Sequence, residues 1–213
     1  MDVNLIIIAL SVSLLFEGSF FFALSLIYKA MEKKNLRFVN TFLFEVVPGF
    51  KQKYGYIDIL LLFGLVITIA PYVYYGAYHF NTSTMMIMIL SVLLAFCLST
   101  LPFIPLNKLK EHYYIALGGL VSVLALYVME GYYCIRLYRL YQDTLELVAM
   151  IMAFAIALLI LIAVFNPKLF DLRNEKNDNG EMVRKKFIFL SFVEWMLYPS
   201  SILALVPILL VSI

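Results

Sequence analysis

Six stretches of this chain are each long and apolar enough to cross a membrane. The hydrocarbon core of a bilayer is about 30 Å thick, which a helix of about 20 residues spans. The stretches run from about residue 4 to 28, 57 to 78, 84 to 104, 114 to 133, 145 to 165 and 187 to 213. Of the 213 residues, 64% are hydrophobic and 14% are charged, whereas soluble domains are about 25% charged. The sequence therefore predicts an all-α, polytopic transmembrane helical bundle in a single integral membrane domain, and excludes a water-soluble monomer.

The distribution of positive charge predicts how the bundle is oriented. Fourteen of the 16 Lys and Arg residues lie in the first, third and fifth connections between spans, and the other two lie in the second and fourth connections. Connections rich in Lys and Arg stay in the cytoplasm. We therefore expect a multi-pass protein of the cell (plasma) membrane, with both termini outside and the long loops in the cytoplasm.

The connection between the first two spans carries a helical pattern of its own. Apolar side chains recur at helical spacing at Leu36, Val39, Leu43 and Val46. The pattern predicts an amphipathic helix over residues 35–47 that lies in the membrane interface. Its role is either that of a connector held on the membrane or that of a docking site for a partner subunit.

The connection at residues 166–186 is polar and of mixed charge, with a turn signal at Asn179-Gly180. Such a composition is typical of a solvated segment. We expect a cytoplasmic hairpin here.

Three carboxylates lie about one turn or more inside the ends of the predicted spans. Glu17 is near the middle of the first span, Glu130 near the outer end of the fourth and Glu194 near the inner end of the sixth. An ionisable group inside a bilayer costs a few kcal/mol by insertion scales and marks a functional site by default. Because the three occupy outer, central and inner depths, they suit a relay of protons or cations.

Each of these carboxylates also has a structural interpretation. Glu130 can reach the outer interface, and Glu194 precedes Trp195, an aromatic residue typical of interfaces or of packing. Glu17 alone has no short route to water. Since no Lys or Arg lies inside any span, tyrosine hydroxyls, backbone carbonyls or a partner protein must satisfy the hydrogen bonds of these groups.

The motif Tyr198-Pro199-Ser200-Ser201 in the sixth span is a second candidate site. A proline within a helix frees a backbone carbonyl and kinks the helix. Freed carbonyls coordinate cations at broken helices, and Ser200 and Ser201 add hydroxyl groups beside the kink. Tyr198 and Ser200 are the candidate site residues of this motif. The alternative is that the membrane helix merely tolerates the proline.

Tyrosines are concentrated near the outer ends of the second and fourth spans. They form either an aromatic vestibule or the ordinary aromatic belt at the headgroups. These residues are Tyr72, Tyr74, Tyr75, Tyr78, Tyr127, Tyr132, Tyr133, Tyr138 and Tyr141.

Motifs for catalysis, cofactors and metals are missing from the sequence. His79 and His112 are expected at opposite ends of the bundle, a membrane thickness apart, so they cannot share a metal or haem. Cys97 and Cys134 form no metal-binding spacing. The net charge of +2 implies no nucleic-acid partner. We therefore expect no cofactor and no catalytic set.

Small residues recur every four positions at Ala149, Ala153 and Ala157, and at Gly118 and Ser122. Such stripes allow helices to pack closely. Besides the lipid bilayer, the stripes suit a homo-oligomer or partner membrane subunits.

Three hypotheses for function follow. The first is a small transport-type unit that moves protons, cations or a small solute through Glu17, with Glu194 and Glu130 as inner and outer stations. The second is a non-catalytic integral subunit of a larger membrane complex, of respiratory or secretion type. The third is a lipid-modifying membrane enzyme, for which the sequence offers no catalytic set.

Overall fold

The computed structural model describes residues 3–43, 45–47, 58–78, 82–104, 109–171, 175–176, 182–183 and 185–213. Within these residues, six helical segments are long and apolar enough to cross a membrane, which confirms a polytopic helical bundle. The helices are α1 (Val3–Glu32), α3 (Asp58–Tyr78), α4 (Thr82–Thr100), α5 (Leu109–Tyr141), α6 (Thr144–Val164), α7 (Phe189–Leu203) and α8 (Leu205–Leu210), with short turns of 3-10 helix at η1 (Leu101–Phe103) and η3 (Pro167–Phe170).

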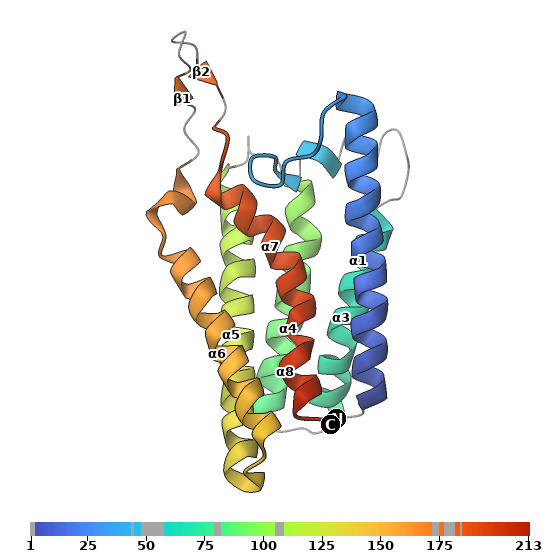
Figure 1. Ribbon diagram of the computed structural model, residues 1–213, viewed down its shortest axis with the longest axis vertical. Coiled ribbons are helices and arrows are strands. Elements are labelled where there is room, and N and C mark those ends of the chain that lie inside the picture. Colours follow the sequence, from blue (N-terminus) through green and yellow to red (C-terminus); the bar gives the residue numbers. More distant parts are fainter. Residues whose placement is uncertain are drawn as a thin grey trace.

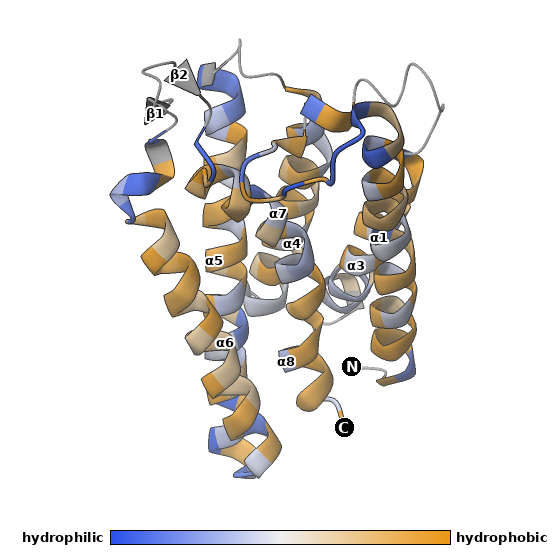
Figure 2. Cartoon of the chain, turned by 45° about the horizontal axis from the view of Figure 1, so that its top comes forward, coloured by the Kyte–Doolittle hydropathy of each residue, from blue (hydrophilic) through white to orange (hydrophobic). Residues whose placement is uncertain are grey.

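Successive spans run in opposite directions, with α7 and α8 together forming the last span, and both termini lie at one end of the bundle (Figure 1). We call this end the terminal face. The opposite end, where α1 ends and α7 begins, is the loop face. Figure 2 shows apolar residues along the lengths of the helices and hydrophilic residues mainly at the two faces, the pattern expected of a bundle whose middle lies in hydrocarbon.

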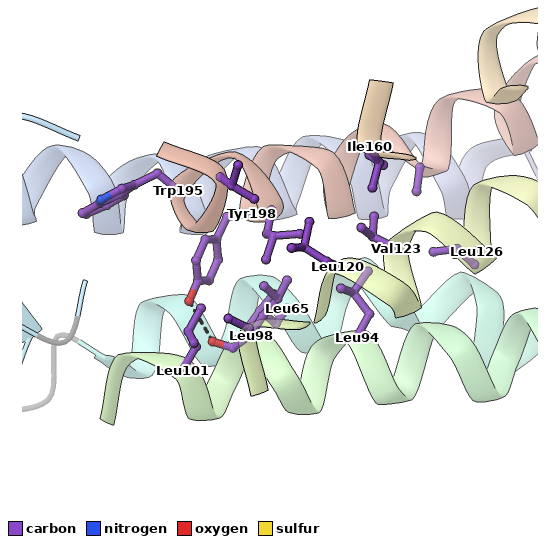
Figure 3. Close-up of a cluster of buried hydrophobic side chains, with 14 of the residues drawn as sticks. Leu65, Leu94, Leu98, Leu101, Leu120, Val123, Leu126, Ile160, Trp195 and Tyr198 are labelled. Carbon is purple, nitrogen blue, oxygen red and sulfur yellow. Dashed lines mark hydrogen bonds between the residues drawn. The ribbon is translucent and has the colours of Figure 1, made fainter. Parts of the chain in front are cut away.

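The last span, formed by α7 and α8, is the central helix of the bundle, and α6 is peripheral. In the apolar window of the last span 61% of the residues are buried, whereas in α6 the share is 17%. The core that surrounds α7 is built of large aliphatic side chains such as Leu98 and Leu120, and the Tyr198 hydroxyl donates a hydrogen bond to the Leu98 carbonyl (Figure 3).

The last span is interrupted at Ala204, between α7 and α8. Pro207 explains the position of the break, because a proline has no N–H to bond the carbonyl four residues earlier and its ring clashes with that carbonyl. That carbonyl belongs to Leu203, the final residue of α7. Pro199, where the sequence predicted the kink, lies inside the continuous helix α7.

The fourth span is longer than the predicted 114–133, since α5 runs from Leu109 to Tyr141. Arg136 and Arg139, expected in a loop, therefore lie in the last turns of this helix. Gln142, with φ of 57°, ends α5, and the Asp143 side chain caps α6 by accepting a hydrogen bond from the Leu145 N–H.

The predicted interfacial amphipathic helix at 35–47 is wrong. Residues 35–42 are not helical, and helical residues occur only at Leu43 and 45–47. The apolar side chains of this segment point into the bundle rather than into lipid: Leu36, Phe42, Leu43, Val46 and Val47 are all buried. We call the described residues of 33–47 the strap.

Polar groups at the start of α7 explain why the strap is not a helix. The Trp195 indole N–H donates to the Thr41 carbonyl at 2.7 Å, and the Ser191 hydroxyl donates to the carbonyls of Phe38 and Thr41 at 3.1 and 3.0 Å. The Ile188 N–H donates to a further strap carbonyl at 2.7 Å. These donors take carbonyls that a helix would use internally.

A short antiparallel pair, β1 (Glu175–Lys176) and β2 (Met182–Val183), lies in the predicted hairpin at 166–186. Lys185 forms an ion pair of 2.6 Å with Asp171 close by. The turn expected at Asn179-Gly180 lies outside the described residues.

Candidate functional site

Glu17 lies in the interior of the bundle, where α1 packs against α3. It belongs to the stripe of α1 residues, spaced at three or four positions, that faces the core, and its exposed fraction is 1%. The Thr68 hydroxyl contacts Glu17 Oε1 at 3.4 Å and Ser13 Oγ at 2.8 Å. Glu17 Oε2 has no hydrogen-bond partner among the described residues.

Gly64 makes the close approach of α1 and α3 possible. A Cβ atom at this position would lie 2.5 Å from Glu17 Cγ and 3.3 Å from the Glu17 backbone N. The Gly64 carbonyl also accepts hydrogen bonds from the Ser13 and Thr68 hydroxyls, at 3.3 and 2.9 Å. Only glycine therefore fits here without moving α1.

We expect Gly64→Ala to destabilise the protein by about 1–3 kcal/mol, the usual cost of overpacking. Gly18→Ala is the matched control, because a Cβ at Gly18 meets nothing within 4 Å; its stability should be unchanged or rise by up to about 1 kcal/mol, because Ala favours a helix over Gly by about that much. Unfolding by SDS in mixed micelles measures both variants. Equal stabilities of the two variants would contradict the close approach.

Glu130, also fully buried, is held on the terminal-face side of the bundle by α3. The Tyr72 hydroxyl donates to Glu130 Oε1 at 2.9 Å, while Glu130 Oε2 has no hydrogen-bond partner within the described part of the chain. We expected tyrosine hydroxyls to form hydrogen bonds with buried carboxylates, and Tyr72 does so with Glu130. Because Tyr72 follows Thr68 by one helical turn, about 6 Å along α3, one face of α3 serves both Glu17 and Glu130.

A small cavity of about 10 Å³ lies between these two pairs. Thr68 and Tyr72 line it from α3, Ser91 from α4 and Ser201 from α7. This volume is close to the minimum that one water molecule needs. The other lining residues are apolar, and neither Glu17 nor Glu130 is among them.

Glu194 is paired with His112, a contact that the sequence analysis missed. His112 Nε2 lies 2.8 Å from Glu194 Oε1, and both side chains are 1% exposed. His112 Nδ1 lies 2.6 Å from the Ile104 carbonyl, so this nitrogen carries the proton that the contact needs. Glu194 Oε2 has no hydrogen-bond partner among the residues described. The pair lies near the loop face, where Phe42 of the strap packs against the His112 ring.

Tyr198 lies one turn after Glu194, on the same face of α7. Its hydroxyl donates to the Leu98 carbonyl, and its ring packs against Phe21, which follows Glu17 by one turn of α1. This residue therefore lies between the central and the loop-face carboxylates.

Ser200 is not brought to the carboxylates. Its hydroxyl donates to the Met196 carbonyl at 2.7 Å, and its own carbonyl accepts from Tyr127 at 2.8 Å. The proposed cluster of Tyr198 and Ser200 hydroxyls at a Pro199 kink is therefore not formed.

The tyrosines, considered above as an aromatic vestibule or as an aromatic belt, include both buried and exposed residues. Tyr72 and Tyr127 are buried, and the hydroxyls of Tyr75 and Tyr133 lie 2.6 Å apart. Tyr74, Tyr132 and Tyr141 are exposed, as an aromatic belt requires.

Glu146 is a further buried carboxylate that sequence reasoning missed. It lies in the first turn of α6 and is 7% exposed, and its Oε2 has no hydrogen-bond partner in the described residues. In the sequence it is the second residue of the predicted span 145–165, a position at which a carboxylate is expected to reach the interface. Both small-residue stripes pack within the chain: the alanines of α6 are buried, and Gly118 faces Cys97.

Among the described residues, no group of three His, Cys, Asp or Glu side chains is placed to hold a metal ion. His79 lies outside the described residues, so its distance from His112 stays a prediction.

Comparison with models of protein families, with curated proteins and with solved structures finds no match to this chain.

Proposed function

We propose that this protein is a small proton-transporting unit, in which Glu17 is the central proton-binding group and Glu194 and Glu130 are the stations on either side of it. The observation that carries the proposal is the line of buried polar groups through the bundle. From the loop face, the line runs from the His112–Glu194 contact past Tyr198, one turn further along α7, to Glu17, and then by way of Thr68 and Tyr72 on α3 to Glu130.

The chemistry of this line favours protons among the species that a transport unit could carry. Carboxyl, imidazole and hydroxyl groups both donate and accept protons. The cavity between Thr68 and Tyr72 has about 10 Å³, enough for one water molecule but not for a solute.

The orientation and location belong to the same proposal. Lys and Arg are concentrated in the connections at the loop face, and the positive-inside rule supports a cytoplasmic position for this face. His112 and Glu194 are then the cytoplasmic end of the line, and Glu130 lies towards the outside of the plasma membrane.

A second candidate function is that of a non-catalytic subunit in a membrane complex, with Glu17 neutralised by a Lys or Arg of a partner. The observation that favours it is an apolar groove between α1 and α7, one of whose lining residues is Glu17. A subunit of this kind should co-purify with fixed partners and be unstable alone, whereas a homo-oligomer that is stable on its own supports the transport unit.

The proposal is tested with purified protein in liposomes that contain a pH-sensitive dye. We expect wild-type protein to dissipate an imposed proton gradient in the presence of valinomycin and potassium. Tyr72→Phe removes the hydroxyl that contacts Glu130, and should lower the proton flux by about tenfold or more, because a positioned proton-transfer group contributes at least that much.

Tyr132→Phe is the matched control, since this tyrosine is exposed and close to Glu130 in sequence. Its proton flux should equal that of the wild type. A wild-type flux no greater than that of empty liposomes would exclude the proposed function.

A further inference from the structure

A polar pocket lies at the loop face, between the end of α1 and the strap. It has a volume of about 830 Å³, within the range of pockets that hold drug-sized ligands. Every residue that lines it is polar or charged, and none of them belongs to the proposed proton path. The pocket is therefore separate from that path.

One wall of the pocket is a turn of the strap that is anchored to the bundle. The N–H groups of Asn40 and Thr41 donate to the Arg37 carbonyl at 3.1 and 3.0 Å. Trp195 and Ser191 of α7 donate to the Thr41 carbonyl at 2.7 and 3.0 Å. Because Arg37, Asn40 and Thr41 all line the pocket, α7 holds this wall in place.

Three cationic side chains of the strap line the pocket: Lys33, Lys34 and Arg37. All three are exposed, and none forms an ion pair within the described part of the chain. Glu32 and Glu45 also line the pocket, and one carboxylate oxygen of Glu45 accepts a backbone N–H of the strap at 2.9 Å. With three cations and two carboxylates, the lining carries one net positive charge and favours an anion.

The pocket lies at the level where the lipid-facing surface of α1 ends. Leu26 and Met31 of α1 are 53% and 38% exposed, and Phe38 of the strap is 40% exposed. Figure 2 shows the change from apolar to hydrophilic residues at the end of α1 and along the strap. Since Lys and Arg near the ends of membrane helices reach the interface, the pocket is open to the lipid headgroups beside it.

The phosphate of a phospholipid is the anion that suits these surroundings. Arg binds phosphate oxygens through its planar set of donors, and Lys binds them as a point charge. Asn35 and Asn40 line the same pocket and add amide donors. Because the net charge of the lining is positive, a headgroup without an ammonium group is favoured over a zwitterionic one.

We propose that this pocket binds the headgroup of an anionic phospholipid, whose phosphate is bound by Lys33, Lys34 and Arg37 and whose acyl chains lie beside the exposed apolar side chains of α1. The inference goes beyond the proposed function, because lipid binding here does not depend on proton transport. A lipid is favoured over an acidic segment of a partner protein because a phospholipid matches both the cationic pocket and the apolar surface that adjoins it.

The test counts phospholipids bound to the purified protein by native mass spectrometry, during titration with dioleoyl phosphatidylglycerol or with dioleoyl phosphatidylcholine. Wild-type protein should bind a first phosphatidylglycerol more tightly than it binds any phosphatidylcholine. The triple variant Lys33→Gln, Lys34→Gln and Arg37→Gln should raise the Kd for phosphatidylglycerol by at least about tenfold, because each Lys or Arg near an anionic lipid contributes about fivefold. Glu32→Gln should lower this Kd, since it removes a negative charge from the pocket.

The matched control removes the same charge from the same face of the bundle. It combines Lys110→Gln, Lys168→Gln and Lys186→Gln, three exposed lysines that do not line the pocket. Its Kd for phosphatidylglycerol should equal that of the wild type. The unfolding midpoint in SDS should show that both triple variants are folded.

Four results would overturn the inference. They are equal affinities of the wild type for the two lipids, an unchanged Kd in the pocket variant, the same rise of the Kd in both triple variants, and displacement of phosphatidylglycerol by inorganic phosphate, which would make free phosphate the ligand. Crosslinking of a partner's acidic segment to Lys34 in the native membrane would also overturn it, in favour of a partner protein.

Discussion

Glu17→Gln is expected to reduce the proton flux through reconstituted protein by more than about 100-fold, the lower range for loss of an essential proton-transfer group. Glutamine has the shape of glutamate and can still accept the Thr68 contact, but it cannot bind and release a proton at neutral pH. Because Glu17 lies between the groups leading to each face, no neighbouring carboxyl can bypass it. The measurement is the initial rate of dye response in liposomes.

The matched control for this prediction is Glu146→Gln. Glu146 is also buried and has an oxygen without a hydrogen-bond partner among the described residues, but it lies on peripheral α6, outside the line. Its flux should equal that of the wild type. The unfolding midpoint in SDS should show that both variants are folded. Equal flux in wild type and Glu17→Gln would exclude Glu17 as the central group.

His112→Ala is expected to destabilise the protein by about 3–5 kcal/mol, which is the usual cost of removing one partner from a buried charged pair. The substitution leaves Glu194 buried without its hydrogen-bond partner. It also creates a cavity beside Phe42 of the strap. Equilibrium unfolding in mixed micelles of SDS and a mild detergent measures the difference. The exposed neighbour Tyr114→Ala should change the stability by less than about 0.5 kcal/mol.

A double variant distinguishes the unpaired charge from the lost packing. His112→Leu combined with Glu194→Leu replaces the pair by apolar side chains, which is often neutral or stabilising. The double variant should therefore be more stable than His112→Leu alone. If the double variant were less stable than that single variant, the stranded carboxylate would not be the cause of the loss.

The helical spans were predictable because membrane insertion depends on local composition. A run of about 20 apolar residues has few alternatives to a helix in hydrocarbon, since every backbone group must be satisfied within the segment. The ends of the spans were less predictable. At α5 the apolar run ends near residue 133, but the helix continues to Tyr141, because helix propensity persists into polar sequence.

The candidate site was predictable in its carboxylates and not in their partners. Glu17 and Glu130 were identifiable because charges in apolar runs are rare and costly. Thr68 was not, since a threonine in a membrane helix is common. His112 was placed near the loop face by its position in the chain, but its contact with Glu194 joins residues 82 positions apart.

The sequence by itself determined that this chain crosses the membrane six times, and that Glu17 lies among apolar neighbours along its own helix. Both properties depend only on residues adjacent in the chain. Only the tertiary structure decided what surrounds each carboxylate, that the strap folds into the bundle, and that Gly64 lets α1 approach α3. Those features depend on which faces of the helices contact one another. The apolar pattern of a membrane helix does not identify these faces, because lipid and the protein interior are almost equally apolar.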